Sequence, residues 1–69
     1  MGNEILFLVQ DSPEGGLEAR ALGYPIFTQA ETLEELRMMV RDAVHCHFEE
    51  SLMPKIIRLH FVREEVLAA

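Results

Sequence analysis

The sequence predicts an α+β fold in which three strands precede one helix and a fourth strand follows it. Three observations carry this prediction. The chain has 69 residues, which supply apolar material for one core, so residues 1–69 are expected to form a single domain. Three short strand-like segments come first, separated by breaks that contain Pro and Gly. A longer segment with the period of an amphipathic helix follows them.

The first two strands are predicted on either side of a turn. Residues 4–10 form an apolar run rich in β-formers, which is too short for a typical helix. Residues 11–16 contain a proline, which cannot donate to a strand ladder, and two glycines that tolerate positive φ, so the chain is expected to reverse there. Residues 17–22 alternate apolar and charged side chains, as in a strand with one solvated face. The residues expected to face the core are Leu17, Ala19 and Ala21.

A third strand and the helix come next. Residues 23–25 form a second break, and residues 26–29 have strand composition. The run from Thr32 to Glu35 fits a capping box, in which the Thr32 hydroxyl accepts from the Glu35 N–H and the Glu35 carboxylate accepts from the Thr32 N–H. The helix is predicted to run on to about Glu50. Its apolar stripe is Leu33, Leu36, Val40, Ala43, Val44 and His47.

The last strand is predicted from Lys55 to Val62, after Pro54 has prevented the helix from continuing. Its side facing the core is Ile57, Leu59 and Phe61. Residues 63–69 are expected to form a tail that could hold one helical turn. Because the helix is the only long crossover, the last strand should lie parallel to the first. The result is a mostly antiparallel four-stranded sheet of order 3-2-1-4, with one helix packed on one face.

One helix can cover only one face of such a sheet, so the other face is expected to carry a contact surface. The candidate residues on that face are Leu6, Leu8 and Ile56, with Arg20 and Arg58 as charge partners. Met38 and Met39 on the helix are a second candidate contact, because thioether side chains adapt to varied partners. The alternatives are scattered exposed apolar residues for the sheet and core packing for the methionines.

Charge and composition restrict the partner. Twelve acidic and six basic residues give a net charge of -6, which opposes direct binding to nucleic acid and favours a basic protein partner. The 49% share of hydrophobic residues is high for so small a chain, and predicts a homo-oligomer, with a dimer favoured. No run of about 18 apolar residues predicts a membrane span, and no basic segment marks a signal peptide. A cytoplasmic protein is expected.

No pattern in the sequence predicts catalysis, a cofactor or an intrachain metal site. His45, Cys46 and His47 are consecutive helical residues, so their side chains diverge by about 100° each and cannot grip one ion together. A role in metal binding between chains stays open. His47 is expected to pack its ring within the apolar stripe. Cys46 is not expected to act as a nucleophile, because its histidine neighbours face other directions.

The segment Phe27-Thr28-Gln29-Ala30-Glu31-Thr32-Leu33-Glu34-Glu35, followed by Val40-Arg41-Asp42-Ala43-Val44, resembles the strand-to-helix signature of HicB-like antitoxins. The resemblance covers residues 5–50 and includes the acidic, Gly-rich turn at residues 11–16. The chain departs from the pattern at Tyr24-Pro25-Ile26, where the family often has Pro-Gly-Cys, and at Ala30, where it has Gly.

The resemblance implies a degraded ribonuclease-H-like fold that binds and blocks a small basic toxin that cleaves mRNA. It does not imply a nuclease here, because Leu6-Phe7-Leu8 occupies the centre of the first strand, and Arg58 and His60 the last, where metal-binding carboxylates would be needed. The operator-binding domain of HicB antitoxins is not expected within these 69 residues. The alternative is a self-associating structural or regulatory domain with no toxin partner.

Overall fold

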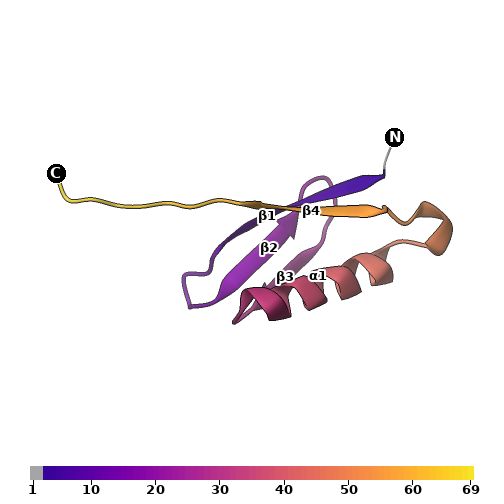
Figure 1. Cartoon of the computed structure of the whole chain (residues 1–69), viewed down its shortest axis with the longest axis horizontal. Helices are drawn as coiled ribbons and strands as arrows, with labels where there is room; N and C mark the ends of the chain where they lie inside the picture. The colour runs from indigo at the N-terminus through magenta and orange to yellow at the C-terminus, as the bar shows by residue number, and fades with distance from the viewer. Residues whose placement is uncertain (1–2) are drawn as a thin grey trace.

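Four strands form one mixed sheet in the computed structural model, which describes residues 3–69 (Figure 1). In chain order the elements are β1 (Glu4–Asp11), β2 (Leu17–Ala21), β3 (Phe27–Ala30), α1 (Leu33–His47), the 3-10 turn η1 (Glu50–Leu52) and β4 (Ile56–Phe61). The sheet order is β3-β2-β1-β4, with β1 antiparallel to β2, β2 antiparallel to β3, and β1 parallel to β4. The predicted fold class, strand order and parallel pairing are confirmed.

The core lies between the sheet and α1, and strand alternation selects its members. Along β1, every second side chain is buried, whereas Leu6 and Leu8 between them are half-buried and face away from the helix. From α1, the residues spaced at three- and four-residue steps enter the same core. The buried apolar residues are Ile5, Phe7, Val9, Ala19, Ala21, Ile26, Leu36, Val40 and Val44. Leu17, Leu33 and Ala43 pack against them as expected.

The first hairpin depends on a glycine at one position. The Ser12 N–H donates to the Gly16 carbonyl and the Gly15 N–H donates to the Ser12 carbonyl, each at 3.0 Å, which closes the turn. Gly16 has a φ of +80°, and a Cβ there would lie 2.5 Å from the carbonyl oxygen of Ala30 on the neighbouring strand. Only glycine fits this combination of positive φ and close backbone approach.

The start of α1 follows half of the predicted capping box. The Glu35 N–H donates to the Thr32 hydroxyl at 3.1 Å, and Thr32 has an extended backbone, as an N-cap residue should. The reciprocal bond was assigned wrongly: the Glu35 carboxylate accepts from the Glu31 N–H at 3.0 Å instead of from Thr32. The glutamate side chain spans the first turn and meets the N–H next to the end of β3. Two hydrogen bonds, one at Glu31 and one at Thr32, therefore stabilise the junction between β3 and α1.

The end of α1 differs from the prediction. The helix ends at His47 and not near Glu50, because Phe48 leaves the helical conformation (φ -109°, ψ 143°) and packs against the core. His47 is therefore exposed, which corrects the expectation that its ring lies within the apolar stripe. Its ring instead contacts Tyr24 and Phe48 edge-on, at centroid distances of 5.8 and 4.8 Å. Neither helical segment of the described chain is long and apolar enough to span a bilayer.

The last strand is less covered than expected. α1 lies mainly against β2 and β3, so Ile57 and Leu59 are only half-buried, and Phe61 is 54% exposed although it was expected to face the core. Residues 62–69 contain no helical turn; they continue β4 as a tail that runs away from the body (Figure 1). The radius of gyration is accordingly 13.4 Å, against about 11 Å for a compact domain of this length.

Candidate protein-binding surface

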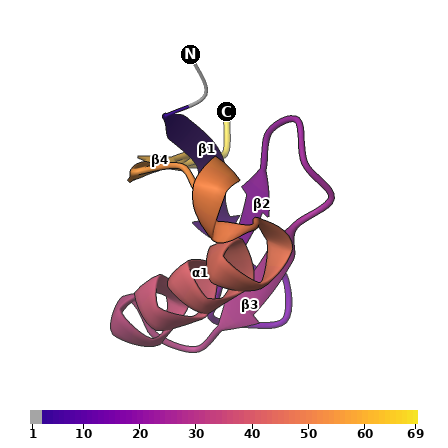
Figure 2. The same cartoon turned by 90° about the vertical axis from the view of Figure 1, so that its right-hand side faces the viewer.

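No helix of the described chain covers the face of the sheet opposite α1 (Figure 2). Leu6 and Leu8 occupy its centre because β1 is an inner strand. The register places Arg58 and His60 of β4 beside them on one side, and Arg20 of β2 beside Leu8 on the other. We call this surface the open face and define it by Leu6, Leu8, Arg20, Leu22, Phe27, Ile56, Arg58 and His60.

The sequence placed five of these residues on one surface, and the structure brings all five together: Leu6, Leu8, Arg20, Ile56 and Arg58. It also adds apolar area that the sequence reasoning missed. Phe27 lies opposite Arg20 across the β2–β3 pair and is 55% exposed, and Leu22 lies next to Leu6, to whose carbonyl its N–H donates. The alternation of Ile26 and Thr28 inward with Phe27 outward was the signal that could have found Phe27.

Arg58 is already paired within the chain. Its Nε donates to Glu4 Oε2 at 2.6 Å and its Nη2 to Glu4 Oε1 at 3.2 Å, a two-point contact between neighbouring strands. Hydrogen bonding to Arg58 holds the pKa of the Glu4 carboxyl below its ordinary value, and the same contact raises the pKa of Arg58. This is the only ion pair between residues 3 and 69, so Arg20 is the arginine of the open face with no ion-pair partner there.

The open face has no deep pocket among the described residues. A hollow lined by Leu8, Gln10, Glu18, Arg20 and Phe27 measures about 20 Å³, which is room for roughly one water molecule. Small-molecule sites need about 300–1,000 Å³. The shape of the open face therefore fits a flat macromolecular contact better than a small ligand.

The two methionines do not join this surface. Met38 and Met39 lie on α1, on the other side of the sheet, and Met38 is 60% exposed. Met39 instead lines a shallow groove together with Glu14, Glu31 and Glu35 at the start of the helix. The candidate residues therefore form two separate surfaces.

The other candidate chemistry is dispersed. His45, Cys46 and His47 are all exposed at the end of α1, and Cys46 is a free thiol. Between residues 3 and 69, no group of three or more His, Cys, Asp or Glu side chains is close enough to hold a metal ion. The carboxylates on the side of the open face are Glu4, which is bound to Arg58, and Glu18, which accepts from the Gln10 amide at 2.8 Å.

Two proteins match this sequence over most of its length. A UPF0150 protein from Archaeoglobus fulgidus is 58% identical over 52 residues, which cover 75% of this chain and 77% of that protein. A UPF0150 protein from Thermotoga maritima is 43% identical over 65 residues, which cover 94% of this chain and 91% of that protein. No family model matches the sequence, and no solved structure matches it.

Proposed function

We propose that this chain, which belongs to the UPF0150 family, is a non-enzymatic, antitoxin-like module that occludes a small basic RNA-cleaving protein. The observation that carries the proposal is the open face, where Leu6 and Leu8 lie uncovered on the central strand. The resemblance to HicB-like antitoxins between residues 5 and 50 supports the class of partner.

Apolar contact supplies the anchor in this proposal. Leu8 lies between Arg20 and His60 in the register, and Phe27 follows beyond Arg20, so a partner side chain placed there would bury leucine and phenylalanine surface together. Burying apolar area contributes roughly 25 cal/mol per Å². Aromatic and arginine side chains are also the residues that most often dominate binding energy at protein interfaces. Among the residues that surround Leu6 and Leu8, Phe27 and Arg20 are therefore expected to contribute most to the binding energy.

Charge attracts a basic partner over long range, whereas apolar contact is expected to hold the partner once it is bound. Glu4 and Glu18 balance Arg20 and Arg58 on this side of the sheet, so the net charge of -6 arises from acidic residues elsewhere. Such a field raises the rate at which a basic protein meets this chain, and salt weakens it. The acidic exterior also disfavours RNA itself as the ligand. We place the complex in the cytoplasm, where mRNA is available to the partner.

The test takes any small basic protein that is encoded next to this chain, purifies it, and mixes it with a labelled RNA. Adding the wild-type chain is expected to stop RNA cleavage at one chain per partner molecule, while the chain alone leaves RNA intact with added Mg²⁺ or Mn²⁺. Leu8→Glu, on the open face, should abolish protection by placing a charge in the apolar centre. Met38→Glu, on the opposite side, is the matched control and should protect like the wild type.

Three results would count against the proposal. RNA cleavage could continue at excess wild-type chain, Met38→Glu could lose protection while Leu8→Glu keeps it, or the chain alone could cleave RNA in a reaction that one acidic substitution abolishes. A genome position without any small basic neighbour would favour the alternative, a self-associating structural or regulatory domain with no toxin.

A further inference from the structure

The sheet has two edge strands, β3 and β4, and β4 is the more open to pairing with another strand. β3 forms one edge with only four residues, and short edge strands resist pairing. β4 forms the other edge with six residues, and the tail extends it further. Neither Pro nor Lys occurs from residue 56 to residue 69, although these residues commonly block edge pairing. Val66 and Leu67 on the tail are 89% and 78% exposed.

The accessible surface of the chain shows how much area this arrangement leaves open. The described chain exposes 5609 Å², whereas a compact monomer of 7.9 kDa is expected to expose roughly 4,400 Å². The excess is about 1,200 Å², and a standard protein interface buries about 800 Å² on each partner. The exposed area is thus sufficient for a stable contact between two chains.

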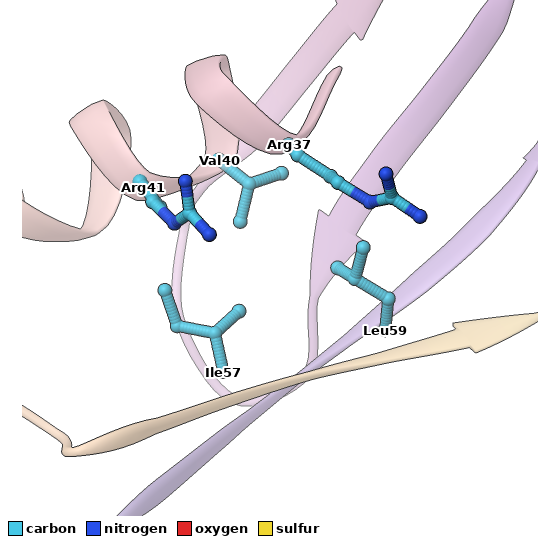
Figure 3. Close-up of a pocket in the computed structure, with 5 residues that line it drawn as sticks. All are labelled: Arg37, Val40, Arg41, Ile57 and Leu59. Atoms are coloured by element: carbon cyan, nitrogen blue, oxygen red, sulfur yellow. The ribbon is translucent and has the colours of Figure 1, made fainter. Parts of the chain in front are cut away.

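A hollow beside β4 indicates which side chains a segment bound to this edge should offer. Because α1 lies mainly over β2 and β3, a space of about 190 Å³ remains between the helix and the last strand. Ile57 and Leu59 of β4 form its floor, and Val40 lies above them on α1, between Arg37 and Arg41 (Figure 3). Neither arginine forms an ion pair within residues 3–69. The hollow therefore suits a segment that offers apolar and acidic side chains in alternation.

The backbone of β4 fixes which groups point outward. The Val62 N–H donates to the Val9 carbonyl at 2.8 Å, and the Ile56 N–H donates to the Asn3 carbonyl, so the even-numbered residues bond to β1. The N–H and C=O groups of Ile57, Leu59 and Phe61 consequently point to the free edge. These are also the residues whose side chains face the hollow side of the sheet.

We propose that a second copy of this chain binds this edge, with β4 and the tail of each copy pairing antiparallel about a two-fold axis at Val62. Val62 then lies opposite Val62 of the other copy, Leu59 opposite Glu65, and Ile57 opposite Leu67. The tail thereby brings Leu67 onto the apolar floor and Glu65 beside Arg37. Two-fold symmetry keeps both helices on the same side of one eight-stranded sheet and closes the assembly at two chains.

Neighbouring registers are less favourable. An axis at Phe61 would place Arg63 of the other copy over Leu59, beside Arg37, and an axis at Arg63 would place two arginines directly opposite one another. Like charges opposite each other destabilise strand pairs. The register centred on Val62 instead places Phe61 opposite Arg63, where a guanidinium can lie over the ring, and His60 opposite Glu64. This contact reaches only the β4 margin of the open face and leaves Leu6, Leu8 and Phe27 uncovered, so it goes beyond the proposed function and does not depend on it.

A charge exchange tests the contact. Sedimentation equilibrium of the full chain is expected to give twice the mass of one chain. Glu65→Arg should weaken dimerisation at least tenfold, because it places a third cation beside Arg37 and Arg41, and adding Arg37→Glu to the same chain should restore most of it. Both positions are exposed in one chain, so circular dichroism should show an unchanged fold. A wild-type monomer, or a Glu65→Arg dimer as strong as the wild type, would overturn the proposal.

Cross-linking tests the register. In a Cys46→Ser background, Val62→Cys should form a disulfide-linked dimer on oxidation, since facing residues of a non-hydrogen-bonded pair have Cα atoms about 4.5 Å apart. Phe61→Cys is the matched control: its two copies would be roughly 8 Å apart, which is too far for a disulfide. Efficient cross-linking of Phe61→Cys without that of Val62→Cys would overturn the register. Protection of RNA is a separate measurement on a separate surface, so either proposal can fail alone.

Discussion

Arg58 on β4 grips the carboxylate of Glu4 on β1 with two hydrogen bonds, the shorter of them 2.6 Å, and so joins the edge strand to the central strand. Both side chains are substantially exposed, and solvent screens their attraction. The contact matters less for stability than for position, because it holds the Arg58 side chain at Glu4, on the strand pair where Arg58 lies beside Leu6.

The first prediction concerns the titration of Glu4. Hydrogen bonding to Arg58 lowers its pKa, so the pair's contribution to stability is present above the ordinary carboxyl range near pH 4.5 and is lost as the pH falls through the lowered value. In a carbon-detected NMR titration, Glu4 should titrate below that range in the wild type and return to it in Arg58→Gln. Equal Glu4 curves in the two proteins would contradict the pairing.

The second prediction concerns the first hairpin. Gly16→Ala should lower the free energy of unfolding by about 2 kcal/mol or more, because it adds left-handed strain and places a Cβ against the Ala30 carbonyl. Gly23→Ala is the control: its φ is +87°, but a Cβ there meets no atom within 4 Å, so it should cost only about 1 kcal/mol. Urea denaturation measures both. Equal losses would mean that the close approach to Ala30 is unimportant.

The third prediction concerns a buried hydroxyl. Thr28 is 8% exposed, and its Oγ1 has no hydrogen-bond partner within residues 3–69. Thr28→Val keeps the shape and removes the unsatisfied group, so it should raise the free energy of unfolding by about 1 kcal/mol. Thr28→Ala also removes the hydroxyl but leaves a cavity, and should be less stable than Thr28→Val. A Val variant less stable than the wild type would show that the hydroxyl is satisfied in solution.

The fourth prediction concerns the start of α1. Thr32→Ala removes the acceptor for the Glu35 N–H and should lower the free energy of unfolding by about 1 kcal/mol. Thr32→Ser retains the acceptor and should stay within a few tenths of a kcal/mol of the wild type. Thermal unfolding resolves this, since about 1 kcal/mol shifts Tm by roughly 4–8 °C in a domain of this size. Equal stabilities of Thr32→Ala and Thr32→Ser would show that the Thr32 hydroxyl does not cap the helix.

The sequence was sufficient for the order of the elements and for most of the core. Strand alternation separated Phe7 from Leu8, and the single crossover placed β4 parallel to β1. Both features follow from backbone geometry, which has few solutions: side chains alternate along a strand, and a parallel neighbour needs a long connection.

The features that the sequence did not predict depend on how side chains pack in three dimensions. At the end of α1, the larger, apolar Phe48 takes the core position that periodicity gave to His47. Phe27 was missed although alternation with the inward-facing Ile26 and Thr28 turns it to the open face; only its place opposite Arg20 depends on the register. The hollow at Ile57 and Leu59 depends on how far α1 lies across the sheet, and side-chain volumes set that distance rather than the period of the stripe.

Methyl NMR during titration with the basic partner tests the central claim, that the open face is the protein-binding surface. With Leu, Ile and Met methyl groups labelled, we expect large shift changes at Leu6, Leu8 and Ile56 and none at the buried Leu36 or at Met38. Changes centred on Met38 and Met39, with Leu6 and Leu8 unmoved at saturation, would contradict it.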